Sequence, residues 1–93
     1  MNIPPVPPLN FKKCADNVTI YPHAKIVQSE AIEIGNNSRI DDFTFIAGGK
    51  GMKIGRYVHI ASFVSIIGSG ELEIGDYVGI ACGARIITGT DHY

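Results

Sequence analysis

The sequence predicts an all-β domain in which the chain winds four times through a three-sided coil of parallel strands. From residue 20 onward, isoleucines recur every six residues, and two sixes followed by an eight make a cycle of twenty. The pair Ile-Gly opens three cycles, at Ile34, Ile54 and Ile74. A helix does not explain this spacing, because six residues advance roughly 240° around its axis and scatter the isoleucines. A hairpin meander would need period-two alternation with Asn-Gly or Asp-Gly turns, which the sequence lacks.

Residues 1–13 are predicted to form a proline-rich arm outside the coil. Prolines at four of the first eight positions favour an extended segment, which could wrap a neighbouring chain. They also interrupt the continuous apolar helix of a secretory signal, so we expect a cytoplasmic protein. The apolar runs are only a few residues long, and no membrane span is expected.

Residues 14–93 are predicted to form one β-helical domain of four coils, 14–33, 34–53, 54–73 and 74–93. Each beat of six after the first, which opens on Cys14, begins with an aliphatic residue, and every beat of six has a small or β-branched residue at its fifth position. Both positions should point inward. In the beats of eight the seventh position takes that place, so the third side should bulge by two residues. These seventh positions are Ile32, Met52 and Leu72, whereas the fourth member of the column is the ionisable His92, and such a departure from a repeat often marks function.

Stacked coils place like residues above one another at a spacing of about 4.8 Å. The expected interior is made of isoleucine columns. On the corners we expect Phe43 to stack on Phe63 and Tyr57 on Tyr77, as structural packing rather than as a cofactor platform. The predicted interior residues are Ile34, Ile40, Ile46, Ile54, Ile60, Ile66, Ile74, Ile80 and Ile86.

The beats IGNNSR, IGRYVH and IGDYVG resemble the repeats of the hexapeptide-repeat acyltransferases. The resemblance covers residues 14–93. It implies a left-handed parallel β-helix, which is an exception to the usual right-handed crossover between parallel strands.

Within that family the segment IGDYVGIACGARIITGTDHY is most similar to sugar O-acetyltransferases of the galactoside and maltose type. This resemblance implies transfer of an acetyl group from acetyl-CoA to a hydroxyl of a sugar or sugar nucleotide, without a metal. It also implies a homotrimer or higher homo-oligomer, and it makes His92 the catalytic base. An asparagine of those enzymes, about thirty residues before the histidine, falls on Ala61 here. The sequence assigns no residue to acetyl-CoA binding.

Of two other functions, an oligomerisation module remains open, and the spacing of the histidines excludes a carbonic anhydrase. Enzymes of this type usually continue for several more coils, so the chain is expected to be an N-terminal portion of one; the alternative is a non-catalytic β-helical oligomerisation module or a truncated relic. A carbonic anhydrase of the γ type needs three histidines, two of them five residues apart. His23, His59 and His92 are 36 and 33 residues apart and do not fit.

The remaining candidate residues have structural explanations. With eight Lys and Arg against nine Asp and Glu, the chain lacks the basic patch of a nucleic-acid-binding protein. His59 should face outward, solvated or in an interface, and His23 lies on a corner. Asp41 and Asp42 should point to opposite faces, which excludes an acid/base pair.

The two cysteines and the last coil lead to two further expectations. Cys14 and Cys82 should be small apolar fillers and remain reduced, because about 14 Å separates their coils. The strand edge of the last coil is uncovered in this sequence, which favours oligomers formed through it or side by side.

Overall fold

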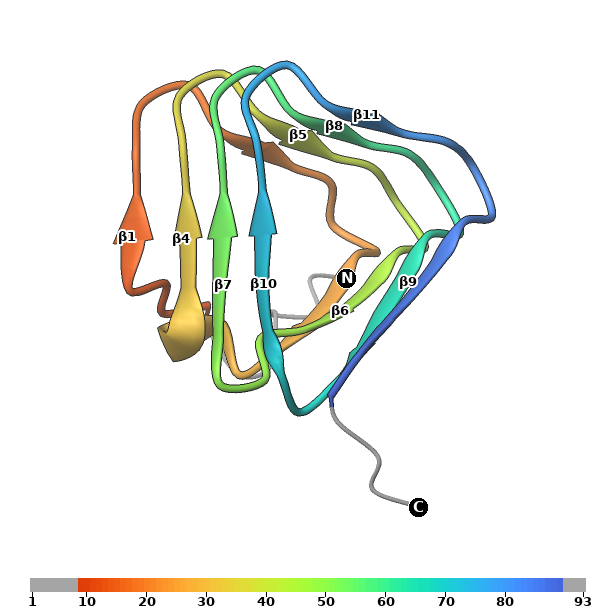
Figure 1. The fold of residues 1–93 in the computed structure, drawn as a ribbon. Helices are drawn as coiled ribbons and strands as arrows, with labels where there is room; N and C mark the ends of the chain where they lie inside the picture. Colours follow the sequence, from red (N-terminus) through yellow and green to blue (C-terminus); the bar gives the residue numbers. More distant parts are fainter. Residues whose placement is uncertain (1–8, 90–93) are drawn as a thin grey trace, which may run out of the picture.

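Parallel strands stacked into a three-sided β-helix make up the fold (Figure 1). The computed structural model describes residues 9–89, which contain three four-stranded sheets and one short 3-10 helix, η1 (Ser29–Ala31). Sheet A contains β1 (Lys13–Cys14), β4 (Ile32–Ile34), β7 (Gly51–Ile54) and β10 (Glu71–Ile74). Sheet B contains β2 (Thr19–Ile20), β5 (Arg39–Ile40), β8 (His59–Ile60) and β11 (Gly79–Ile80). Sheet C contains β3 (Lys25–Val27), β6 (Phe45–Ala47), β9 (Ser65–Gly68) and β12 (Arg85–Thr88).

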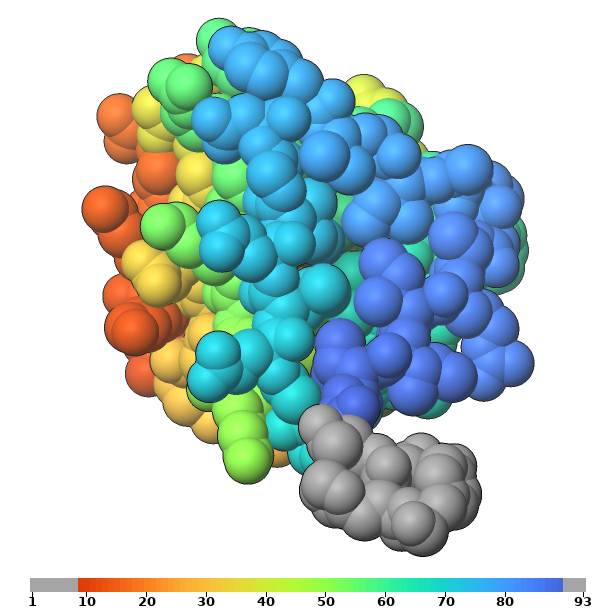
Figure 2. All heavy atoms as spheres, viewed as in Figure 1, coloured from red at the N-terminus to blue at the C-terminus, as the bar shows by residue number. Residues whose placement is uncertain are grey.

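The coil is left-handed, as the resemblance implied. In Figure 1 the chain climbs sheet A, crosses sheet B to the right and descends sheet C, so it turns clockwise. Figure 2 shows the last coil, in blue, in front of the earlier ones. A chain that turns clockwise while it approaches the viewer traces a left-handed helix, which confirms the predicted fold class.

The register between coils is twenty residues on all three sides. Ile20 pairs with Ile40 and Ile40 with Ile60 in sheet B, while Ile26 pairs with Ile46 in sheet C. Every strand of a coil therefore repeats the pairing of the coil before it. The predicted cycle of twenty is confirmed.

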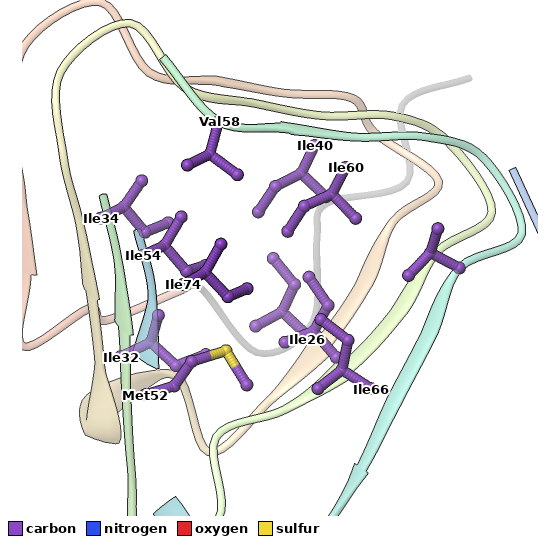
Figure 3. Packing of buried hydrophobic residues seen from close by; sticks show 12 residues of the cluster. Ile26, Ile32, Ile34, Ile40, Met52, Ile54, Val58, Ile60, Ile66 and Ile74 are labelled. Carbon is purple, nitrogen blue, oxygen red and sulfur yellow. The ribbon is translucent and has the colours of Figure 1, made fainter. Parts of the chain in front are cut away.

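Isoleucine columns fill the interior (Figure 3). Ile34, Ile54 and Ile74 form one column, and Ile40 and Ile60 form another, with Ile46, Ile60 and Ile66 fully buried. Ile80 and Ile86 pack against this core but are only half-buried, because they lie in the last described coil.

Two polar residues among the predicted inward positions are buried with their hydrogen bonds satisfied. The Ser38 hydroxyl donates to the carbonyl of Gly55 over 2.7 Å and accepts from the Val58 amide over 3.1 Å. The Thr44 hydroxyl donates to the Asp41 carbonyl over 2.9 Å. Ser38 therefore joins its corner to the next coil, while Thr44 closes the turn within its own coil, and both bonds stabilise the corners.

The third side bulges as predicted. In the first coil the two-residue insertion is accommodated by the three-residue helix η1, which follows Gln28 in a left-handed conformation (φ 55°). In the next coil they form a tight turn, in which the Gly51 amide donates to the Gly48 carbonyl over 3.1 Å. Ile32 and Met52 then take the inward position, as predicted.

The other two corners use left-handed residues, and several of these are aromatic. Phe43, Phe63, Tyr57 and Tyr77 all have φ between 56° and 63°. The Phe43 and Phe63 rings stack with centroids 5.6 Å apart, and the Tyr57 and Tyr77 rings are 5.3 Å apart. Positive φ is unfavourable for bulky residues, and ring stacking between coils offsets part of that cost. Both predicted aromatic stacks are confirmed.

A close backbone approach explains the Ile-Gly pair that opens a coil. A Cβ on Gly35 would lie 2.7 Å from the carbonyl carbon of Gly55 in the next coil. The corner that follows is held by side chains of the next coil. The Asp16 amide donates to Asn36 Oδ1 over 3.2 Å, and the Arg56 amide donates to Asp76 Oδ1 over 2.8 Å.

Both cysteines are free, as predicted, but they are not core fillers. Cys14 and Cys82 are both exposed. Cys14 lies in β1, which is the edge strand of sheet A, and Cys82 lies on a corner of the last described coil. Their expected role as buried apolar residues was therefore wrong, because their positions have no coil over them within residues 9–89.

Candidate functional site

The predicted catalytic base, His92, lies outside the described residues. The last described strand, β12, ends at Thr88, which pairs with Gly68 and whose hydroxyl donates to the Ile67 carbonyl over 3.5 Å. The assignment of His92 therefore stays a prediction.

Another histidine, His59, lies in a polar cluster on the outer surface of sheet B. Its Nε2 atom is 2.8 Å from Oδ2 of Asp41 and 2.8 Å from Nη2 of Arg39. Arg39 also pairs with Asp41, with 3.0 Å between Nε and Oδ1. Arg39 and His59 are neighbours because β5 and β8 pair in register, and Asp41 joins them from the residue that follows β5. The cluster thus joins two consecutive coils.

The His59 ring nitrogen can satisfy only one of its two neighbours at a time. With its proton on Nδ1, neutral His59 accepts a hydrogen bond from the Arg39 guanidinium; with a proton on Nε2, it donates to the Asp41 carboxylate. The protonated ring forms an ion pair with Asp41 across one coil. A carboxylate that holds one nitrogen orients the imidazole for proton transfer through the other, which is the chemical capacity of this cluster.

The sequence contained the signal for this cluster, although our interpretation of the individual residues missed it. Arg39 and His59 are one period of twenty apart, and Asp41 lies two residues after Arg39, on the same side of a strand. His59 does face outward, as expected, with about 45% of its side chain exposed. Asp41 and Asp42 contact different partners: Asp42 accepts from the His23 amide over 2.7 Å, and the His23 ring stacks on Phe43.

An open groove lies beside the cluster, between the Tyr57 corner and the outer surface of sheet B. Amide, hydroxyl, guanidinium and imidazole side chains line it, together with one tyrosine, and such groups suit a polar ligand. The lining residues are Asn17, Thr19, Asn37, Ser38, Arg39, Tyr57, Val58 and His59.

A second charged pair, Arg56 and Asp76, lies on the corner between sheets A and B. The Arg56 guanidinium contacts Asp76 Oδ2 through Nη2, at 3.2 Å, and Nε, at 3.4 Å. The hydrogen bond from the Arg56 amide, followed by that from its guanidinium, lowers the pKa of Asp76. The hydrogen bond to Asp76 raises the pKa of Arg56. Both side chains are exposed, so the pair contributes little to stability.

We expect the substitution Arg56→Gln to raise the pKa of Asp76 towards the ordinary aspartate value. The backbone hydrogen bond would remain and the guanidinium contacts would be lost, so the rise should be partial. Because folding lowers this pKa, the contribution of Asp76 to stability is present above about pH 4 and is lost as the pH falls through the folded-state pKa. Carbon-detected NMR titration of the carboxyl group measures the shift. Arg85→Gln, on β12, is the control, and an unchanged Asp76 titration in Arg56→Gln would contradict the assignment.

Residues 9–89 offer neither a metal centre nor a membrane-spanning helix. Residues 9–89 contain no group of three or more His, Cys, Asp or Glu side chains placed to hold a metal ion. The described part of the chain also has no helix with the length and apolar character that a membrane crossing needs.

Comparison with known proteins gives one similar solved structure. No protein-family model matches the chain, and no curated protein matches it. The solved structure is a point mutant of AntD, an N-acyltransferase from Bacillus cereus, in complex with dTDP and coenzyme A. It is 30% identical with a TM-score of 0.56, and the match covers 74% of this chain and 40% of the AntD chain. The chain thus spans less than half the length of the enzyme it resembles.

Proposed function

We propose that this chain forms the β-helical part of an acyltransferase that uses acetyl-CoA and modifies a sugar or sugar nucleotide. The similarity in sequence and fold to an acyltransferase in complex with coenzyme A carries the proposal. The dTDP in that complex supports a nucleotide-linked acceptor. We further propose a cytoplasmic homotrimer or higher homo-oligomer, which the resemblance to hexapeptide-repeat acyltransferases supports.

The proposed reaction moves the acetyl group from sulfur to oxygen. His92 accepts the proton of the acceptor hydroxyl while its oxygen attacks the thioester carbonyl carbon. The tetrahedral intermediate collapses with cleavage of the carbon–sulfur bond, and the imidazolium returns the proton to the leaving thiolate. Since a histidine has an ordinary pKa near 6.5, it suits both steps at neutral pH.

Transfer to an amine is the second candidate. The enzyme in the similar structure is an N-acyltransferase, so an amino sugar linked to a nucleotide is an alternative acceptor. Amine and hydroxyl acceptors with the same nucleotide distinguish the two reactions.

We expect His92→Ala to lower kcat for acetyl transfer by about 10²- to 10⁴-fold in the protein that carries this chain. Coenzyme A release is measured with a thiol reagent, with nucleotide sugars that offer either a hydroxyl or an amine. His23→Ala, at the exposed end of the Phe43 stack, is the control and should leave kcat unchanged. Full activity of His92→Ala would move the base to another residue, with His59 tested next. Absence of transfer to every acceptor would favour a non-catalytic oligomerisation module.

A further inference from the structure

The outer surface of sheet A carries one column of charges whose sign alternates from coil to coil. Register pairs Lys13 with Glu33, Glu33 with Lys53, and Lys53 with Glu73. These residues alternate along their strands with the inward isoleucines, so all four point away from the core. Glu33 is half-buried and the other three are exposed. Figure 2 shows this side of the molecule with the four strands following one another from orange to cyan.

A second groove runs along the outer surface of sheet A, and four more charged residues line it. With them, the net charge of this face is zero. Glu30 and Lys50 lie at equivalent places before β4 and β7, and Lys12 and Glu71 complete the set. Four lysines and four glutamates therefore share one face. Within residues 9–89 one ion pair forms among them, between Lys12 Nζ and Glu33 Oε2 at 3.9 Å. The remaining six charges have no opposite charge within that distance in the described part of the chain.

Two copies of such a face can meet in two symmetric ways, and the charges select one of them. If the two-fold axis runs along the stack of coils, each charge meets its own copy, which is repulsive throughout. If the axis runs along the strands, between β4 and β7, the stacks are antiparallel. Each residue then meets one from the other half of the ladder.

Every pair in the antiparallel arrangement joins opposite charges. Lys13 meets Glu73 of the second copy and Glu33 meets Lys53. Glu30 meets Lys50, which precedes β7. Two-fold symmetry forms each pair twice, which gives six pairs from three relations. At the centre Ala31 faces Gly51, and these small residues allow the two faces to approach.

We propose that sheet A is a self-complementary interaction surface that binds a second copy of this chain with antiparallel stacks. The alternating ladder, the neutral total and the small central residues all fit an identical partner, and an acidic or a basic partner would meet repulsion from half of the charges. Four strands about 4.8 Å apart, each at most four residues long at about 3.3 Å per residue, form a face of about 14 Å by 13 Å, or roughly 200 Å². This is well below the standard interface of about 800 Å² per partner. The association is therefore weak, with a dissociation constant of about 0.1–1 mM, and it is disrupted by salt.

Charge reversal gives the decisive test. Lys53→Glu changes the ladder to one positive and three negative charges, and Glu33→Lys changes it to three positive and one negative. In either variant alone, the two contacts between positions 33 and 53 become repulsive, but antiparallel pairing of the first with the second restores all four ladder contacts as opposite charges. Sedimentation velocity at 1 mM protein in 20 mM salt should show reversible doubling of the assembly mass for the wild type and for the equimolar mixture. For each variant alone, the dissociation constant of the association should rise at least tenfold.

The controls separate this surface from any other assembly. Lys25→Glu makes the same charge change on the exposed side of β3 in sheet C and should associate as the wild type does. The milder variants Lys53→Gln and Glu33→Gln should each weaken association several-fold, and far-UV circular dichroism checks that all variants fold. If other faces hold the chain in a trimer, the charge variants should still sediment as trimers and should lose only the further doubling of mass. Failure of the wild type to associate at low salt, or failure of the mixture to recover association, would overturn the proposal. Acetyl transfer is not needed for either result.

Discussion

Replacement of Ile60 by aspartate should abolish cooperative folding or lower the free energy of unfolding by several kcal/mol. Ile60 is fully buried in β8, between Ile40 in the coil before and Ile80 in the coil after. A carboxylate there would have no cationic partner and would lose its hydration, which costs far more than a missing aliphatic contact. Its column is continuous, so a charge in the middle destabilises the coils on both sides.

A matched substitution on the surface separates burial from charge. Ile87, in β12, has about 69% of its surface exposed, so Ile87→Asp should change stability by about 0.5 kcal/mol or less. Thermal and urea unfolding followed by circular dichroism measure both variants. Wild-type unfolding of Ile60→Asp would show that the interior register is wrong.

Gly68→Ala should lower the free energy of unfolding by about 3 kcal/mol, because a side chain at this position would strike the next coil. Gly68 has φ of 127°, and an added Cβ would overlap the carbonyl oxygen of Thr88. The same Cβ would lie 2.7 Å from the Thr88 amide nitrogen. Since backbone cannot rotate away as a side chain can, β12 would have to separate from β9.

Gly79→Ala is the control for this substitution. Gly79 lies in β11, and an added Cβ would meet nothing within 4 Å. Its stability should stay the same or rise by about 0.4–1 kcal/mol, since alanine restricts the unfolded chain. Equal losses in the two variants would mean that the approach between β9 and β12 does not decide the effect.

The geometry of the repeat determines which surfaces can carry function. Every outward position recurs once per coil, so the side chains at equivalent positions form a column. A binding surface is therefore made of one column or of two neighbouring columns. The cluster of Arg39, Asp41 and His59 is of this kind on sheet B, and the alternating charges are of this kind on sheet A. Function in such a fold depends on which member of a column departs from its neighbours.

Most of the fold was predictable because each coil repeats the same inward and outward positions. The isoleucine spacing predicts the strands, the interior columns and the register of twenty, and the two extra residues in each third beat predict the bulge. The corner aromatics followed from the same register, because Phe43 and Phe63 occupy one column and Tyr57 and Tyr77 another. Handedness came only from the resemblance, since spacing is identical in a left-handed and a right-handed coil.

Other features depended on how individual residues are placed in space. The two-residue insertion is accommodated by a 3-10 turn at Ser29–Ala31 but by a hydrogen-bonded turn at Gly48–Gly51, and the spacing alone does not distinguish the two. The cysteines were assigned to the interior from residue type, whereas their places on an edge strand and a corner leave them exposed.

The sequence by itself determined the repeat, the strands, the core and the corners of this protein, because burial of one aliphatic residue per beat is a periodic requirement that the chain records directly. Only the tertiary structure decided which outward side chains meet. Whether His59 reaches Asp41, or Arg56 reaches Asp76, depends on rotamers and on distances of a few ångströms between neighbouring coils. Spacing brings such residues to adjacent positions, and the three-dimensional packing of their side chains determines whether they form a contact.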